Sequence, residues 1–310
     1  MHIDLYLVLG SAVVGLLVGL TGVGGGALMT PMLVLLFGIA PTAAITSDLV
    51  AALFMKPAGV AIHWRRGTVE TGLVKYLCIG SLPAAFTGTY VLHLMGESTV
   101  AEHRLQVVLG SALIIGALAM LGRSIVPTSR RAAPKLVVKK GLTVAIGAVG
   151  GFMVGLTSVG AGSLILVLVV MVYPALRNDQ LVGTDLAQSV PLTLSATLGT
   201  LLFNHVSFSL TTSIILGSVP AVIVGALLSS RSNGIVLRRI ITGSVLLSGL
   251  KYVGLSTDGL GVAAGVIAVA IIAITMRHVY LRGEATRLES VARSIEAADL
   301  RKTAELDADA

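Results

Sequence analysis

The sequence predicts an all-α polytopic membrane protein built from two inverted-topology repeats. Hydrophobic residues make up 55% of the 310-residue chain and charged residues only 12%, and the mean hydropathy is +0.94. Apolar runs of transmembrane length recur along most of the chain. The stretch 18–26, Val-Gly-Leu-Thr-Gly-Val-Gly-Gly-Gly, returns at 154–162 as Val-Gly-Leu-Thr-Ser-Val-Gly-Ala-Gly. Together these observations indicate a duplicated helical membrane domain.

Further matches at nearly the same spacing support the duplication. Residues 80–84, Gly-Ser-Leu-Pro-Ala, return 137 positions later as Gly-Ser-Val-Pro-Ala at 217–221, and Ser47-Asp48 returns as Thr184-Asp185. A constant offset across separate motifs indicates one internal duplication. We therefore expect a first transmembrane repeat at 1–122, a basic linker at 123–140, a second repeat at 141–255, an extra transmembrane helix at 256–281 and a charged tail at 282–310.

Each repeat should begin with a glycine-tipped helical segment and continue with three transmembrane helices. Residues 5–39 are almost uncharged, and each arm beside the glycines has about 15 residues, hence roughly 22 Å of helix against a hydrocarbon core of about 30 Å. We expect a hairpin of two short helices with its tip deep in the membrane; a single long broken helix is the alternative. The remaining segments are expected at 43–63, 72–95, 105–122, 141–173, 180–203, 209–229, 235–253 and 259–276.

The distribution of basic residues predicts the orientation. The linker contains no acidic residue, and its basic residues are Arg123, Arg130, Arg131, Lys135, Lys139 and Lys140. Basic loops stay in the cytoplasm, so the linker and the charged tail should be cytoplasmic. Three crossings after a hairpin then place the first repeat's start outside and the second repeat's start inside. If each glycine segment crossed once, the repeats would be parallel and the basic residues near 231–239 would lie outside, which fits the charges less well.

The two glycine motifs are the candidate substrate site. A helix that starts just after a glycine tip directs free N–H groups and its positive dipole end toward the tip, which suits an anion. Two inverted copies would bring both tips to the membrane midplane, where transporters of this design hold their substrate. Close helix packing by glycine is the structural alternative. The candidate substrate-binding residues are Thr21, Gly22, Gly24, Gly25, Gly26, Thr157, Ser158, Gly160 and Gly162.

Few charged residues are expected to be buried in the membrane zone, namely Asp48, Lys56 and Asp185, and ionisable groups there are costly and mark functional sites. Asp48 and Asp185 are candidates for coupling, because a carboxylate there can be neutralised by a proton or a sodium ion; the alternative places them near helix starts at the interface. Lys56 either attracts an anion or extends toward the cytoplasm. Pro57 and Pro191 are expected to interrupt corresponding helices, another mark of transporter sites.

Other classes of function lack support in the sequence. The histidines show no metal-ligand spacing, there is one cysteine, and no nucleophile elbow or HExxH motif is present, so no catalytic residue, metal or cofactor is expected. Aromatic residues do not interleave with the basic linker, so no nucleic-acid partner is expected. The expected partners are a small anionic substrate, the lipid bilayer, a coupling proton or sodium ion and further copies of the chain in a homo-oligomer.

The glycine motif followed by Leu28 and Pro31, its second copy, and the Gly-Ser-Leu/Val-Pro-Ala pair resemble the TauE/SafE sulfite exporter family across residues 5–255. The resemblance implies a bacterial or archaeal inner-membrane carrier for sulfite, organosulfonates or related anions, coupled to an ion gradient. The resemblance identifies neither the transported anion nor the direction of transport. Export of sulfite or an organosulfonate is therefore the leading hypothesis, with uptake of sulfate-like, thiosulfate-like or carboxylate anions and a non-transporting membrane scaffold as alternatives. The second copy departs at Ser158 and Ala161, so the two halves should bind unequally.

Overall fold

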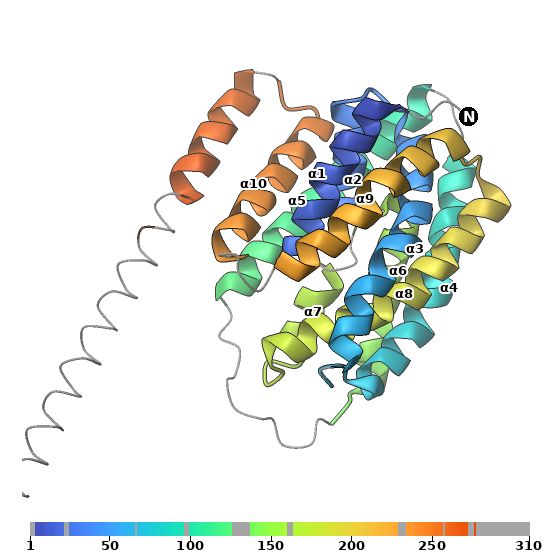
Figure 1. Cartoon of the computed structure of the whole chain (residues 1–310), viewed down its shortest axis with the longest axis vertical. Helices are drawn as coiled ribbons and strands as arrows, with labels where there is room; N and C mark the ends of the chain where they lie inside the picture. Colours follow the sequence, from blue (N-terminus) through green and yellow to red (C-terminus); the bar gives the residue numbers. More distant parts are fainter. Residues whose placement is uncertain are drawn as a thin grey trace, which may run out of the picture. The chain divides into compact units, whose positions relative to one another are not determined.

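The computed structural model describes residues 4–21, 25–65, 67–95, 99–125, 137–159, 164–228, 234–256, 258–271 and 276. These residues form helices and no strands, which confirms the predicted all-α class (Figure 1). The labelled helices are α1 (Leu5–Thr21), α2 (Gly26–Leu35), α3 (Pro41–Arg65), α4 (Thr71–Met95), α5 (Thr99–Ile125), α6 (Lys140–Thr157), α7 (Leu164–Val172), α8 (Asn178–Phe203), α9 (Phe208–Leu228) and α10 (Gly234–Tyr252).

Several helices are suited to a membrane. Within the described ranges, five stretches are long and apolar enough to cross one: Thr71–Met95, Ala101–Leu121, Lys140–Thr157, Gln180–Phe203 and Phe208–Leu228. Helix α3 is as long as α4, but the charged residues Asp48 and Lys56 in its interior make it less apolar. Its polar residues turn inward, as the site below shows.

Contacts divide the chain into two units, Met1–Gly261 and Val262–Ala310. The second unit contains the end of a short apolar helix, Asp258–Ile271, and Met276. The charged tail expected at 282–310, most of the basic linker and the end of the predicted extra span lie outside the described residues. All further structural statements concern the first unit.

Both glycine segments fold back on themselves. Gly10 of α1 lies against Met32 of α2, and Gly150 of α6 lies against Ile165 of α7. The second helix of each pair therefore returns along the first, and Figure 1 shows α1 and α2 side by side. A hairpin, rather than one long broken helix, occupies each glycine segment.

Helices α3 and α8, which occupy corresponding positions in the two predicted repeats, run in opposite directions. The hydroxyl of Thr46, near the start of α3, donates to the backbone carbonyl of His205, just after α8. Conversely, the backbone N–H of Glu70, just before α4, donates to the hydroxyl of Thr184, near the start of α8. Helices α3 and α8 are therefore antiparallel, as inverted repeats require. Which side of a membrane each end faces stays a prediction.

Glycines allow helices of one repeat to pack closely on helices of the other. Helix α1 packs along α9, and α4 packs along α6. A side chain at Gly15 of α1 would collide with the backbone of Ser218 in α9, and one at Gly151 of α6 would collide with the backbone of Ser81 in α4. Small residues permit such close approach of helices in membranes. Part of the repeated glycine content, including the Gly-Ser-Leu/Val-Pro-Ala pair, is therefore used for packing.

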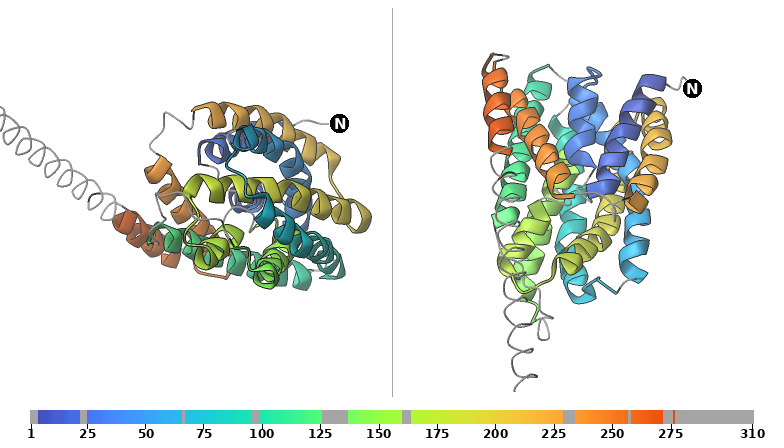
Figure 2. Two further views of the ribbon diagram at one scale, coloured as in Figure 1. Left: turned by 90° about the horizontal axis from the view of Figure 1, so that it is seen from below. Right: turned by 60° about the vertical axis from the view of Figure 1, so that its left-hand side comes forward.

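Apolar side chains fill the spaces between these helices. Three clusters of buried residues, which contain Leu77, Leu33 and Leu113 respectively, lie among the helices of both repeats. Figure 2 shows the helices up to α10 gathered into one bundle and running along a shared long direction. The hairpins thus lie inside a packed bundle, which holds their glycine tips in place.

Candidate anion and coupling site

The two glycine motifs meet inside the bundle. A side chain at Gly26, the first residue of α2, would overlap the backbone carbonyl of Ser158. Ser158 ends α6 in the left-handed conformation, with φ of 59°. The sequence predicted that the tips come together, and the structure brings Gly26 and Ser158 into contact. The remaining tip residues Gly22, Gly24, Gly160 and Gly162 lie outside the described residues.

Gly25 and Gly26 have different surroundings although they are neighbours. Among the described residues, a Cβ atom at Gly25 would meet only the end of the Met55 side chain, with the Cε atom 3.5 Å away, whereas one at Gly26 would overlap backbone. Met55 directly precedes Lys56 on α3. Helix packing therefore explains the glycine at position 26. Packing against the described residues does not explain the one at position 25, which lies beside the end of the Met55 side chain.

Asp48 connects α3 to both motifs. Its side chain is fully buried, and its Oδ2 atom accepts hydrogen bonds from Thr30 Oγ1 of α2 at 2.9 Å and from Ser158 Oγ at 2.8 Å. Its Oδ1 atom is also buried and has no hydrogen-bond partner among the described residues. Asp48 lies well inside α3, which begins at Pro41, and Asp185 lies equally far inside α8, which begins at Asn178. Neither aspartate therefore caps the start of its helix.

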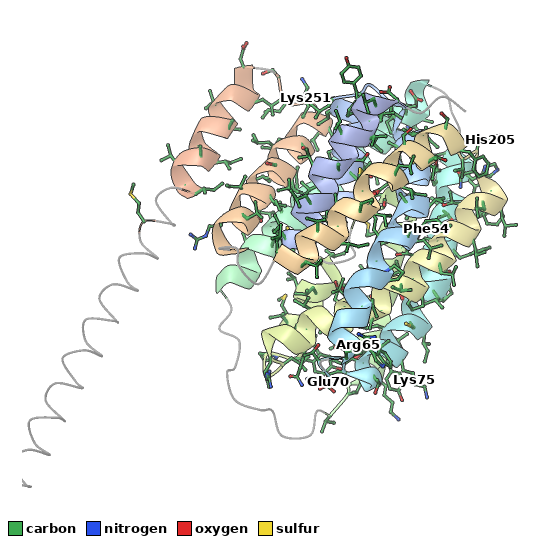
Figure 3. The ribbon with its side chains drawn as sticks, viewed as in Figure 1. Phe54, Arg65, Glu70, Lys75, His205 and Lys251 are labelled. Atoms are coloured by element: carbon green, nitrogen blue, oxygen red, sulfur yellow. The ribbon has the colours of Figure 1, made fainter. Side chains whose placement is uncertain are left out.

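Lys56 reaches from one repeat to the other. Its Nζ atom donates a hydrogen bond to Thr193 Oγ1 of α8, and Thr193 stands 137 positions further along the chain, at the offset of the duplication. The buried aspartates Asp48 and Asp185 are the acidic groups whose charges act on Lys56. Lys56 thus points across the bundle and not toward the end of α3. Figure 3 places the neighbouring Phe54 between the ends marked by His205 and Arg65.

The motif threonines are oriented toward their own helices. Thr21 Oγ1 donates to the carbonyl of Leu17 at 2.6 Å, and Thr157 Oγ1 donates to the carbonyl of Met153 at 2.7 Å. In this arrangement their hydroxyl hydrogens are directed away from a ligand at the tips. Anion binding would therefore fall to backbone N–H groups and Lys56, unless the hydroxyls rotate.

Pro57 and Pro191, which were predicted to interrupt their helices, do not end them. Helix α3 continues past Pro57 to Arg65, and α8 continues past Pro191 to Phe203. A proline inside a helix removes one hydrogen bond and leaves the carbonyl four residues earlier without its usual donor. Because the surrounding bundle holds both helices, each proline weakens its helix near the buried charges without ending it.

Two polar residues of the site were not predicted from the sequence. Thr30 was hidden because a threonine in an apolar helix has no partner that can be recognised from the sequence. Thr193 had a usable signal, because it lies 137 positions after Lys56. Residues at equivalent positions of inverted repeats meet where the two halves face each other, so the offset points to this pair.

A helical membrane bundle with two facing glycine hairpins and buried charges has the architecture of a membrane transporter. The profile of the sulfite exporter TauE/SafE family matches residues 7–252, and the chain belongs to this family. It is 41% identical over 246 residues to the "Probable membrane transporter protein YjnA" of Bacillus subtilis (strain 168), covering 77% of this chain and 96% of that protein. It is 23% identical over 245 residues to the "Probable membrane transporter protein YdhB" of the same organism, covering 76% and 94% respectively. The protein is accordingly a membrane transporter and not an enzyme.

Proposed function

We propose that the protein is a secondary transporter that exports a small sulfur-containing oxyanion, sulfite or an organosulfonate, across the inner (plasma) membrane. Its family supports the class of substrate. The observation that carries the proposal is the contact between Gly26 of the first glycine motif and Ser158 of the second. This contact creates a polar, backbone-rich meeting point inside an otherwise apolar bundle, and irregular backbone at such depth is tolerated where it lines a binding cavity.

The anion would bind beside Gly25, at the start of α2. The first N–H groups of a helix have no acceptor within the helix and carry the positive end of its dipole. Met55 is the nearest side chain to Gly25, and the adjacent Lys56 carries the positive charge that a buried anion needs. Among the described residues, Gly25 faces only the flexible end of Met55, unlike Gly26, which packs against backbone, and this difference supports a ligand position beside Gly25.

The membrane orientation follows from the basic residues of the bundle. Arg65 and Lys75 lie at the end opposite His205 (Figure 3), and the ring of Tyr76 there lies under the ammonium group of Lys140. The positive-inside rule then places this Arg65 end, the linker 123–140 and the C-terminal tail in the cytoplasm.

Uptake is the second candidate, and the buried carboxylates favour it. The membrane potential drives an anion out of the cell with about 2.3 kcal/mol per charge per 100 mV, so export needs no coupling ion. Uptake must overcome this driving force and needs a cation that enters with the anion. Asp48 and Asp185 are the groups that would bind such a cation.

Transport by purified protein in lipid vesicles tests both candidates. Sulfite, sulfoacetate, sulfate and acetate are loaded on one side in turn, with the membrane potential clamped by potassium and an ionophore. We expect saturable exchange of a sulfur oxyanion, and inhibition of that exchange by the same anion on the opposite side. Selective exchange of acetate would support a carboxylate carrier, and no exchange or stabilisation by any anion would support the scaffold alternative.

A further inference from the structure

We infer that Asp48 binds one proton and that the transported anion binds together with this proton. The second half of the inference rests on the proposed anion transport, but not on its direction. The first half concerns the protein alone and has its own test.

The inference begins with the charges inside the bundle. In the described part of the chain, the charged side chains away from helix ends and loops are Asp48, Lys56 and Asp185. If all three are ionised, the interior carries a net charge of −1, which is costly in a low-dielectric environment. One bound monovalent cation removes this excess charge.

Asp48 is the carboxylate that holds the excess charge. Lys56 donates its hydrogen bond to Thr193 of α8, the helix that also carries Asp185, and it makes no hydrogen bond to the fully buried Asp48 among the described residues. Both hydrogen bonds to Asp48 end on its Oδ2 atom, whereas the buried Oδ1 atom accepts none from the described residues. A buried ionised oxygen without a donor is unfavourable. A proton on Oδ1 neutralises the group and leaves both hydrogen bonds intact.

A proton fits this site better than a sodium ion does. Thr30 and Ser158 direct their hydroxyl hydrogens at Asp48 Oδ2, so in this arrangement both hydroxyl groups act as donors to the carboxyl group. A sodium ion requires several oxygen ligands turned toward it at once. A proton requires one carboxylate oxygen, and Asp48 Oδ1 supplies it.

Few charged groups pack around Asp48. Lys56 is on the same helix and Asp185 is on α8. The described residues of α2 and α9 include no titratable side chain, and those of α5 and α6 with a full charge lie toward the ends of these helices. Asp185 and Lys56 are therefore the charged neighbours that decide the protonation of Asp48.

The proton and the anion should bind cooperatively because they share the tips. Ser158, which donates to Asp48, also contacts Gly26 beside the proposed anion position. An anion there would face an ionised Asp48 at short range, and like charges repel strongly in a low-dielectric interior. Protonation removes this repulsion. By linkage, the bound anion must in turn favour the protonated form of Asp48.

Infrared difference spectroscopy tests the proton site without any substrate. A protonated carboxyl group absorbs apart from an ionised carboxylate, so a titration of the protein in lipid should show an acid band that Asp48→Asn removes. Asn keeps an oxygen that can accept from Thr30 and Ser158, so the variant should stay folded. Glu102→Gln, near the start of α5, is the matched control and should leave the band unchanged. Persistence of the full band in Asp48→Asn, or its absence from the unaltered protein over the whole pH range of stability, overturns the proton site.

A binding titration tests the coupling. Sulfate is a suitable probe because its charge is constant over the working pH range. Above the pH at which Asp48 loses its proton, we expect the affinity for sulfate to fall about tenfold per pH unit, and Asp48→Asn should abolish this slope. Sulfate binding that keeps the same slope in Asp48→Asn overturns the coupling. A preserved acid band with no binding of sulfate, sulfite or sulfoacetate at any pH would count against the anion half and leave the proton site standing.

A different observation carries a second proposal. At the Arg65 end, the loop before α4 is bound to the start of α8: the Glu70 N–H donates to Thr184 Oγ1 at 3.0 Å, and Gln180 Nε2 donates to Glu70 Oε1 at 2.7 Å. A Cβ atom at Gly183 would be 2.8 Å from the carbonyl oxygen of Thr68, so the loop also packs tightly. We name residues 67–70 with these contacts the inner latch.

The counterpart at the His205 end is only partly formed: Thr46 Oγ1 donates to the His205 carbonyl at 3.4 Å, but among the described residues the equivalent of the bond from the Glu70 N–H to Thr184 is missing. Ser47 corresponds to Thr184, and Ser207 corresponds to Glu70, each at an offset of 137. Yet Ser47 Oγ is buried with no hydrogen-bond partner among the described residues, and Ser207 is exposed. The two ends thus differ in this hydrogen bond: Thr184 Oγ1 accepts from the Glu70 N–H, whereas Ser47 Oγ does not accept from the Ser207 N–H.

We propose that the transporter alternates between these two latches, so that opening the inner latch accompanies a bond from the Ser207 N–H to Ser47 Oγ. Each end of the bundle would then be closed by its own set of hydrogen bonds, as alternating access to a central site requires. The alternation also explains why a serine is kept at a fully buried position without a partner in this state.

Disulfide cross-linking tests the alternation without a substrate. In a Cys78→Ser background, one protein carries Glu70→Cys with Thr184→Cys, a second carries Ser47→Cys with Ser207→Cys, and a third carries all four changes. Each pair should cross-link, but mass spectrometry of the third protein should find either disulfide and not both in one molecule. Both disulfides in the same molecule, or no cross-link of the Ser47 and Ser207 pair in any condition, overturns the proposal.

Discussion

Asp48 of the first repeat accepts a 2.8 Å hydrogen bond at its Oδ2 atom from the hydroxyl of Ser158 in the second repeat. The two residues are 110 positions apart in the chain, and Ser158 belongs to the motif copy that departs from its partner at this position. The departure from glycine to serine therefore has a structural reason. The serine supplies a hydroxyl donor to the buried carboxyl group.

Ser158→Ala should destabilise the protein by about 1–3 kcal/mol, because a buried carboxyl group loses one of its two donors. Thermal unfolding in detergent measures the effect. Ser111→Ala is the matched control: that serine is exposed and donates only to the carbonyl of Val107 within its own helix. Equal unfolding temperatures for the two variants would show that the Asp48–Ser158 bond contributes no stability.

Leucine substitutions at the two adjacent glycines should have opposite consequences. Gly25→Leu should abolish anion binding and leave the protein inserted and monodisperse, because among the described residues the added side chain meets only the flexible end of Met55 and occupies the proposed anion position. Gly26→Leu should prevent folding, because no side chain fits against the Ser158 carbonyl. Size-exclusion chromatography and anion titration measure the two effects. Normal anion transport by Gly25→Leu would contradict the proposed site, and loss of folding in both variants would favour packing.

Lys56→Met should lower anion affinity at least tenfold, because the proposed anion loses its only cationic neighbour among the described interior residues. Thr193→Val should have a smaller effect, since it removes a hydrogen-bond partner of Lys56 and leaves the charge in place. Lys75→Met, at the Arg65 end, is the control and should bind anions normally. Equal affinities for Lys56→Met and Lys75→Met would remove Lys56 from the anion site.

Cysteine labelling from one side of the membrane should confirm the predicted topology. In a Cys78→Ser background, Arg130→Cys and Ser294→Cys should react from the cytoplasm, and His2→Cys and Ser98→Cys from outside. External labelling of Arg130→Cys would reverse the orientation. Cytoplasmic labelling of His2→Cys would contradict the inverted arrangement in the membrane.

The fold was largely readable from the sequence. Helical membrane structure follows from hydropathy and length, and both are local properties of the chain. The repeat is found by comparing the sequence of one half of the chain with that of the other half. Even the two hairpins could be predicted, because arms of about 15 residues are too short to cross the hydrocarbon core. The two prolines were harder: a proline weakens a helix locally, but whether Pro57 or Pro191 ends one depends on the helices packed around it.

The sequence by itself determined which residues are unusual: glycines in apolar segments, two aspartates and one lysine in predicted spans. Only the tertiary structure decided which of them meet. It placed Ser158 and Thr30 on the same oxygen of Asp48, joined Lys56 to Thr193, and distinguished Gly26, which packs against backbone, from Gly25 beside Met55. The physical reason is that hydropathy and helix breaking act along the chain, whereas a buried hydrogen bond depends on the distance between helices that are remote in sequence.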